Sequence, residues 1–429
     1  MSAVSAAAEP VDFRAWPAGR MIANWAIAII AFLGAFVIDE PAPYELLLCP
    51  IIVVWSLFGL RLNRHFAPMA VLLLLYITGG LLSLTQLRDP LAGLMYMATS
   101  LFLGLSAIFF AAVVWVEPAR RLSIIKNAYI GGAVVASAIG ILAYFRILPN
   151  SEMFLLYDRI KGTFQDPNVF GPFIVLPIIF LAQDILQGRP RLMLKAGLLL
   201  ILILAEFLAF SRAAWGMTVL GLILVAAFAF LTEGKQLARF RIATAFMIGA
   251  ALVVVLIVVA LSIPAVSNLF EQRAQLVEYY DSGEFGRFAR YDLGFQLLQQ
   301  RPLGIGPGSF AKLFGEDEHN MWLKGFSDYG WLGGFSYIVL AAWTLIAAGR
   351  LIFRPRPWQP YLHAVYAVFI GQIMIHNVID NDHWRHLFLI YGLLWGMVAA
   401  EKVYRRSMRQ GAPLIVAHHA QALAVSPAR

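Results

Sequence analysis

The amino-acid sequence predicts an all-α membrane protein, a polytopic bundle of about twelve transmembrane helices with one long loop on its outer side. Three observations predict this fold class. Hydrophobic residues make up 60% of the 429 residues and charged residues only 14%, with a mean hydropathy of +0.74, whereas soluble domains carry about 25% charged residues. Apolar runs of bilayer length recur along the chain. Lysine and arginine gather in alternate connections between these runs.

Twelve apolar segments have about the length of a transmembrane helix. The first nine lie within residues 21–263 and the last three within 321–402. Two of the segments are longer than a perpendicular crossing needs, which predicts tilted helices. The segments are near 21–38, 44–60, 67–84, 91–116 and 122–145 (the last two being the long ones), then 168–186, 192–210, 213–231, 242–263, 331–349, 361–379 and 386–400.

The alternation in basic content predicts the orientation. Positive residues are retained on the cytoplasmic side, so residues 1–20 and the tail 403–429 are both expected in the cytoplasm. Because residues 1–20 have no apolar core, we expect segment 21–38 to be an uncleaved signal anchor. The net charge of +8 therefore reflects the orientation of the chain in the membrane and does not indicate nucleic-acid binding. Contact with anionic membrane lipids would be a minor role of these cations.

One connection, residues 264–320, is much longer than the others and lies on the outer side. It is too long for a simple turn. Its stretches NLFEQRAQLVEYY (268–280) and RFARYDLGFQLLQQ (287–300) have amphipathic helical patterns. We therefore expect a large outer loop that contains helices.

The outer connections also contain cations that the orientation rule does not explain. Guanidinium groups bind phosphate in a bidentate manner, so this set predicts an anionic ligand at the membrane surface. The alternative for each cation is an ion pair with a nearby carboxylate such as Glu271, Glu278, Asp281 or Glu284. The outer cations are Arg146, Arg159, Lys161, Arg212, Arg273, Arg287, Arg290, Arg301, Lys312 and Arg385.

The first outer motif is GTFQDPNVFG, residues 162–171. Asp166 and Pro167 are typical of the N-cap and the first residue of a helix. A helix start alone leaves Asn168 and the upstream Arg159 and Lys161 less well explained. We regard these three as possible substrate contacts.

The second motif is FSRAAW, residues 210–215, a tight connection between two apolar segments. Ser211 is expected to cap the following helix, which places Arg212 in the first helical turn. A cation there is unfavourable beside the positive end of the helix dipole. An anion bound by Arg212 and by the free backbone N–H groups reverses that penalty. The alternative is a structural ion pair between Arg212 and Glu206.

The third motif is EHNMWLKGFSDYGWLGG (318–334), which leads from the long loop into an apolar segment. His319 and Gly330 are eleven residues apart, or three helical turns, and we expect them on one face of a helix. A glycine there lets the helix pack closely and fixes His319 above the membrane. Asn320 is a further possible substrate contact. The upstream GIGPG (304–308) is expected to be a tight turn, because no strand precedes it as in a nucleotide-binding loop.

Four motifs together resemble one family. GTFQDPN, SRAAW, R-x3-Y followed by RPLGIGPGSF, and HN followed by nine residues and a glycine are similar to those of the membrane O-antigen ligase and polysaccharide polymerase superfamily. The resemblance covers about 159–395, and twelve spans with a long periplasmic loop match that fold. It implies a metal-independent glycosyltransferase without a cofactor, in the bacterial inner membrane. Such an enzyme takes a glycan from an undecaprenyl-diphosphate carrier on the periplasmic face.

The resemblance also implies residue roles. Arg212 and Arg287 would bind the donor diphosphate, and His319 would act near the acceptor hydroxyl. Because Tyr291 stands where tryptophan is common in the family, the loop arginine is either Arg287 or Arg290. The acceptor is lipid A core for a ligase and another lipid-linked glycan for a polymerase, and the sequence leaves both open.

These residue types fit the implied chemistry. Displacing a lipid diphosphate from an anomeric carbon builds negative charge on the leaving group, and fixed guanidinium groups stabilise that charge. The attacking hydroxyl needs a base or an orienting hydrogen bond, and histidine has a pKa near neutrality. The polar stretch before the apolar segment is then the rim of an active site.

The stretch HNVIDNDHWRH (376–386) offers a competing site. His376, Asp380 and His383, at spacings of four and three residues, are expected to share one helical face, as metal ligands do. The resemblance favours no metal. The other interpretations are a polar rim in which His376 and Asp380 contact the acceptor, and plain structural pairing.

A lipid-linked oligosaccharide transporter or flippase remains the alternative function, because it too can have twelve spans. Transporters place ionisable residues near the bilayer midplane. The main candidate inside a predicted span is Glu206, which lies near the outer end of its segment. A non-catalytic membrane protein is a third class, but it does not need a concentration of outer arginines.

Overall fold

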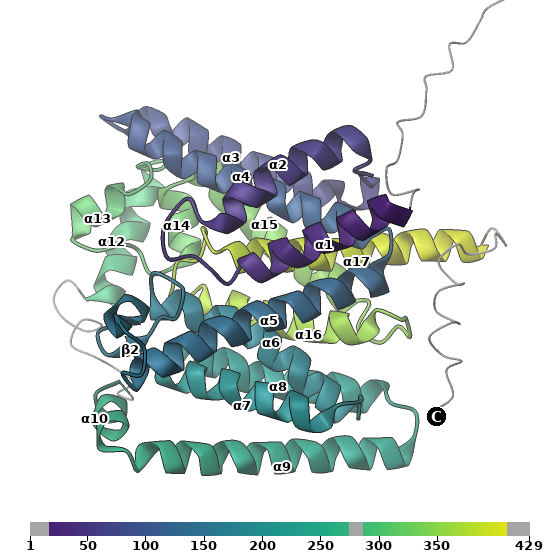
Figure 1. Cartoon of the computed structure of the whole chain (residues 1–429). Helices are drawn as coiled ribbons and strands as arrows, with labels where there is room; N and C mark the ends of the chain where they lie inside the picture. Colours follow the sequence, from purple (N-terminus) through teal and green to yellow (C-terminus); the bar gives the residue numbers. More distant parts are fainter. Residues whose placement is uncertain (1–16, 274–285, 410–429) are drawn as a thin grey trace, which may run out of the picture.

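A computed structural model describes residues 17–273 and 286–409, and this part of the chain is an all-α bundle (Figure 1). The long helices run roughly side by side. They are α1 Pro17–Leu33, α2 Pro43–Phe58, α3 Ala67–Ser83, α4 Pro90–Val114, α5 Pro118–Tyr144, α6 Pro167–Leu186, α7 Leu192–Leu208, α8 Arg212–Thr232, α9 Gln236–Leu261, α15 Gly330–Gly349, α16 Gln359–Ile375 and α17 Arg385–Arg409.

Each predicted apolar segment coincides with one of these helices, so the predicted fold class is confirmed. In the described residues, eight helices are long and apolar enough to cross a membrane. The remaining four, α1, α2, α7 and α16, are apolar helices of 16 or 17 residues. The loop-borne helices are shorter: α10 Pro264–Arg273, α12 Arg287–Gln299, α13 Ser309–Phe314 and α14 Met321–Ser327.

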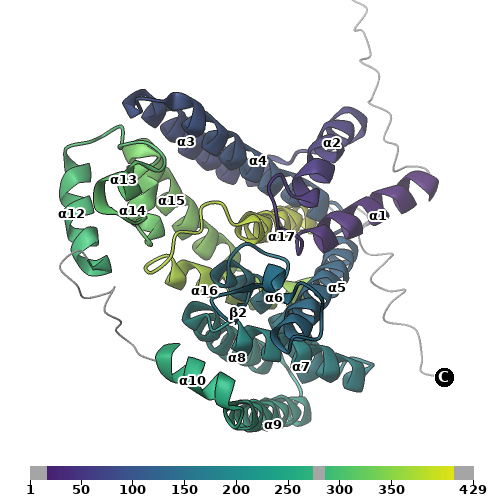
Figure 2. The ribbon, with the colours of Figure 1, turned by 60° about the vertical axis from the view of Figure 1, so that its left-hand side comes forward.

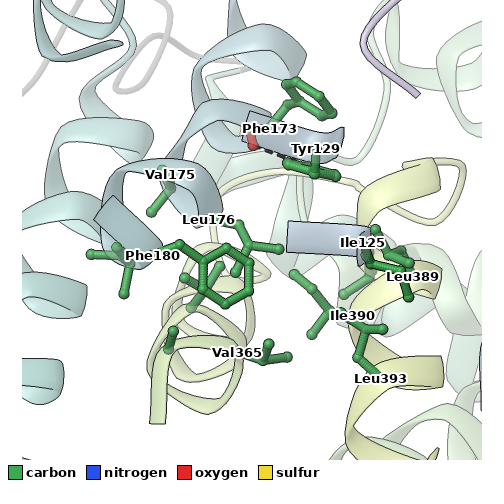
Figure 3. Packing of buried hydrophobic residues seen from close by; sticks show 14 of the residues in the cluster. Ile125, Tyr129, Phe173, Val175, Leu176, Phe180, Val365, Leu389, Ile390 and Leu393 are labelled. Atoms are coloured by element: carbon green, nitrogen blue, oxygen red, sulfur yellow. Dashed lines mark hydrogen bonds between the residues drawn. The ribbon is translucent and has the colours of Figure 1, made fainter. Parts of the chain in front are cut away.

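The core of the bundle lies around α6 and α17. Figure 3 shows part of it, where apolar side chains of α5, α6, α16 and α17 meet. Tyr129 of α5 donates a hydrogen bond of 3.1 Å to the carbonyl of Phe173 in α6. This buried hydroxyl therefore keeps a partner, as buried polar groups in folded proteins do.

Helix α9 lies at the edge of the bundle (Figure 1), and many of its apolar side chains are exposed. Leu252 and Val258 are each 63% exposed, and Val255 is 58% exposed. Apolar surface in water costs about 25 cal/mol per Å², a penalty that contact with lipid chains removes. The exposure of α9 agrees with a membrane protein.

The shorter elements gather at one end of the bundle, which we call the loop end. Figure 1 shows α10, α12, α13, α14 and β2 there, at the left, while α17 ends at the other end; Figure 2 turns the loop end forward. A small antiparallel hairpin of β1 (Leu155–Leu156) and β2 (Arg159–Ile160) lies there too. Helices α10 and α12 confirm that the stretches at 268–280 and 287–300 are helical, except for 274–280, which fall outside the described residues.

The expectation that His319 and Gly330 share one helical face is wrong, because the helix is broken between them. Helix α14 ends at Ser327, and Gly330 begins α15 with a φ of +64°. The turn around GIGPG lies against this break: the N–H of Ile305 donates to the carbonyl of Ser327 at 2.8 Å, and that of Trp331 to Pro302 at 2.9 Å. Backbone groups freed by the break thus find partners in the turn.

Candidate functional site

The start of α6 is held to the β-hairpin and to the turn between α7 and α8 by one arginine. Asp166 caps α6 and accepts a hydrogen bond from the N–H of Asn168 at 2.6 Å, and Pro167 is the first helical residue, so this predicted helix start is confirmed. Arg159, 7% exposed, donates to the carbonyl of Ala209 and to Oδ1 of Asn168, both at 2.8 Å. Lys161, half-buried, follows on the same hairpin.

Arg212 is the first residue of α8, as the FSRAAW motif predicted. Ser211 occupies the N-cap position, but its buried hydroxyl makes no hydrogen bond with the described residues, so the expected side-chain cap is absent from this part of the chain. A Cβ on Gly171 would lie 2.8 Å from that of Ala214, so a glycine lets α6 approach α8 here. The buried Glu206 accepts a hydrogen bond of 2.5 Å from Thr218 of α8.

His319 ends the long loop in a left-handed backbone conformation, with a φ of +47°, which is uncommon for a residue other than glycine. Its carbonyl accepts a hydrogen bond of 2.8 Å from the hydroxyl of Tyr291 in α12. Asn320 caps α14 by accepting from the N–H of Leu323 at 3.0 Å, and its amide donates to the carbonyl of Asn377 at 3.2 Å. Three segments distant in sequence therefore fix the position of His319.

The imidazole of His319 faces a carboxylate from the connection between α16 and α17. Its Nδ1 lies 3.5 Å from Oδ1 of Asp380, and the other oxygen of Asp380 lies 3.1 Å from Nζ of Lys324. The side chain of His319 is 38% exposed and that of Asp380 only 17%. Burial acts to raise the pKa of Asp380, but the adjacent His319 and Lys324 outweigh it and hold that pKa well below its usual range. An ionised carboxylate thus supports a histidine that solvent can reach.

Lys324 lies among buried carboxylates, of which Asp380 is the most exposed. Its Nζ is 3.6 Å from Asp328 and 3.7 Å from Glu318. Asp382 is nearby and accepts a hydrogen bond of 2.9 Å from the hydroxyl of Tyr329. Burial raises the pKa of both Glu318 and Asp328. The sequence shows Lys324 and Asp328 as charged residues before an apolar segment, but no pattern in it assigns them a partner.

Some outer arginines are already paired with carboxylates, so for these the ion-pair alternative is confirmed. Arg290, only 4% exposed, lies 2.6 Å from Glu316. Such pairs do not need an anionic ligand, and they narrow the set of cations left to bind one. The other pairs are Arg146 with Glu152, and Arg385 with Glu40 and Glu45. Arg287 begins α12, but its side chain lies outside the described part, as do Glu278, Asp281 and Glu284.

The expected helical face of His376, Asp380 and His383 does not form, because α16 ends at Ile375 and a turn follows. His376 is fully buried, with its Nε2 2.6 Å from the hydroxyl of Tyr337. His383 instead lies 2.9 Å from the hydroxyl of Ser100. Within 17–273 and 286–409, no group of three or more His, Cys, Asp or Glu side chains is arranged to bind a metal ion. The structure thus buries His376 beside Tyr337 and pairs Asp380 with His319.

The comparison with protein families gives one match. The model of the O-antigen ligase family matches residues 197–338, which include Arg212, Arg287, Arg290, His319 and Asn320. The resemblance inferred from the motifs is confirmed over this segment, which is narrower than the expected 159–395. No curated protein matches the chain.

Proposed function

Because residues 197–338 match the O-antigen ligase family, we propose that this chain is a glycosyltransferase that transfers or polymerises a glycan from an undecaprenyl-diphosphate carrier. The family match supports a membrane-bound glycan ligase or polymerase in general, and the carrier, the periplasmic face and the residue roles belong to the proposal. One observation carries it furthest. The half-exposed His319 at the loop end is paired, 3.5 Å away, with the nearly buried Asp380.

The proposal places the donor diphosphate at the start of α8. The first N–H groups of a helix lack partners within the helix, and the positive end of its dipole favours an anion. Arg212 adds a guanidinium at this position. Arg159 orders the same corner by donating hydrogen bonds to Oδ1 of Asn168 and to the carbonyl of Ala209.

A second donor arginine comes from α12 in the proposal. Arg290 is buried and paired with Glu316 at 2.6 Å, so its charge is already balanced. That pairing favours Arg287, one turn earlier, as the donor-binding arginine. Two guanidinium groups then stabilise the charge that develops on the diphosphate, and the proposed chemistry needs neither a metal nor a cofactor.

His319 is assigned the acceptor hydroxyl. With its Nδ1 proton directed to Asp380, the Nε2 lone pair is free to accept a proton. The acceptor oxygen attacks the anomeric carbon, its proton passes to Nε2, and the bond from that carbon to the diphosphate breaks. The bonding electrons leave with the undecaprenyl diphosphate. Asp380 stabilises the imidazolium that forms, and the proton later returns to solvent.

A transporter or flippase remains the second candidate function. Transporter sites lie near the bilayer midplane, whereas α14, which directly follows His319, lies at the loop end (Figure 1). This placement favours an enzyme that works at the membrane surface.

Reconstitution of the full-length protein tests the proposed function. We expect vesicles that contain the protein, an undecaprenyl-diphosphate glycan and one acceptor class, either lipid A core or a second lipid-linked glycan, to form a new glycosidic bond. One undecaprenyl diphosphate should be released per bond. Movement of the donor across the vesicle without bond formation supports a flippase, and the absence of product with either acceptor contradicts the proposal.

Cysteine labelling tests the proposed orientation. In a Cys49→Ser background, Asp158→Cys places a thiol at the tip of the hairpin at the loop end, where the native side chain is 84% exposed. Arg350→Cys places one at an exposed position directly after α15, at the other end. In cells with a permeabilised outer membrane, an impermeant maleimide should label position 158, and position 350 only after lysis. The reverse pattern would place the loop end in the cytoplasm.

A further inference from the structure

Lys324 connects the proposed base to the buried carboxylates behind it. Its Nζ lies 3.1 Å from Oδ2 of Asp380, whose Oδ1 is the atom that faces His319. One carboxylate therefore bridges an ammonium and an imidazole. Lys324 is 6% exposed, and the short helix α14 and the Asn320 cap fix its backbone. Lys324 is too deeply buried to bind a glycan directly.

The charges around Lys324 do not balance. Glu318, Asp328 and Asp382 are 2%, 1% and 4% exposed, and together with Asp380 they surround a single ammonium. If all four carboxylates were ionised, three negative charges would remain in a buried region, which is strongly unfavourable. Protons are therefore retained on some of them, and burial raises the pKa of Glu318 and Asp328. Asp380 is the carboxylate nearest to Nζ, at 3.1 Å, while Asp382 and Asp328 also interact with the ammonium.

We infer that Lys324 is a positioning residue for the proposed glycan transfer: its ammonium favours the ionised form of Asp380 and disfavours an added proton on the His319–Asp380 pair, so that Nε2 of His319 stays available to the acceptor hydroxyl. The inference rests on the proposed function. It assigns Lys324 a role in the reaction without contact to donor or acceptor. Glu318, Asp328 and, from α4, the ring of Tyr96 face the ammonium of Lys324. Asp382 lies in the same cluster, in contact with Tyr329 and His383.

The direction in which loss of the Lys324 charge moves the pH profile follows from the net charge of the His319–Asp380 pair. In its active form, neutral His319 with ionised Asp380, the pair has a net charge of −1, and one added proton makes it neutral. Removing the nearby positive charge favours the protonated form, on whichever residue the proton lies. The pKa of the pair then rises, and transfer is lost at a higher pH than in the parent protein. Lys324→Met should therefore move the acid limb of the activity profile upward.

The test measures transfer by the full-length protein between pH 5 and 9. We expect the acid limb of kcat/KM for Lys324→Met to rise by at least about one pH unit, so that about tenfold more activity is lost at pH 5.5 than at pH 8.5. Lys324→Arg retains the charge and should keep the limb near its parent position. Lys235→Met removes a cation from an exposed position directly before α9 and should leave the acid limb in place. An equal loss at every pH indicates only a packing role and overturns the inference.

A second measurement does not depend on activity. Diethyl pyrocarbonate modifies neutral imidazole, and mass spectrometry of the purified protein gives the extent of modification at His319 against pH. We expect the midpoint for His319 to rise in Lys324→Met and to stay at its parent value in Lys235→Met. If the midpoint shifts but the parent protein transfers no glycan, the proposed function is contradicted, while the effect of the Lys324 charge on His319 stands. An unshifted midpoint in an active enzyme overturns the role of Lys324.

Discussion

His319→Ala is expected to lower glycan transfer by about 10²–10⁴-fold, the range typical of a lost general base, while the donor binds almost as well as before. The reason lies in the division of the proposed site. In the proposal, Arg212 and Arg287 act on the diphosphate, whereas His319, which is paired with Asp380 at 3.5 Å, acts on the acceptor. Transfer and donor binding are measured separately on purified protein with a lipid-linked donor and an acceptor.

A second substitution at the same position separates proton transfer from orientation. His319→Gln keeps a hydrogen-bonding side chain but cannot take the proton, so a large residual rate indicates that orientation dominates. His65→Ala, at a half-buried histidine between α2 and α3, is the matched control and should leave transfer unchanged. If His319→Ala transfers sugar at the parent rate, the proposed mechanism is wrong and the histidine only shapes the loop.

Arg212→Lys is expected to reduce transfer by about ten- to a hundredfold with a normal amount of protein in the membrane. Lysine keeps the charge but loses the planar fork that binds two phosphate oxygens. A charge-assisted hydrogen bond contributes about 1.5–3 kcal/mol, and each 1.4 kcal/mol corresponds to about tenfold in rate. The loss should appear both in donor binding and in transfer, unlike that of His319→Ala.

The arginines of the loop provide an internal comparison for the Arg212 experiment. Arg287→Lys should behave like Arg212→Lys if it is the second donor arginine. Arg290→Lys should lower thermal stability more than it lowers donor affinity, because Arg290 is buried against Glu316. Arg146→Lys, in an exposed pair with Glu152 at the same end, is the control. Near-parent activity of both Arg212→Lys and Arg287→Lys would remove the argument for bidentate diphosphate binding.

Much of the fold was predictable because it depends on local sequence. Length and hydropathy set the positions of the membrane helices, since each must bury its own backbone hydrogen bonds in lipid. Asp166 and Pro167 predicted the start of α6 for an equally local reason, because a cap and its N–H groups lie within three residues. The order of the motifs was likewise visible in the sequence, and the family match confirmed the resemblance of those that lie within residues 197–338.

The sequence by itself therefore determined the class of protein, the helices, and the motifs that contain the candidate residues. Only the tertiary structure decided the partners: Arg290 with Glu316, Arg159 with Ala209, and Asp380 between His319 and Lys324. It also decided the break between α14 and α15, where a turn more than twenty residues upstream takes up the free backbone groups. The physical reason is that periodicity reports which face of one helix is apolar. Ion pairs and hydrogen bonds between distant segments depend on how those faces pack, and packing brings together residues that no spacing in the chain relates.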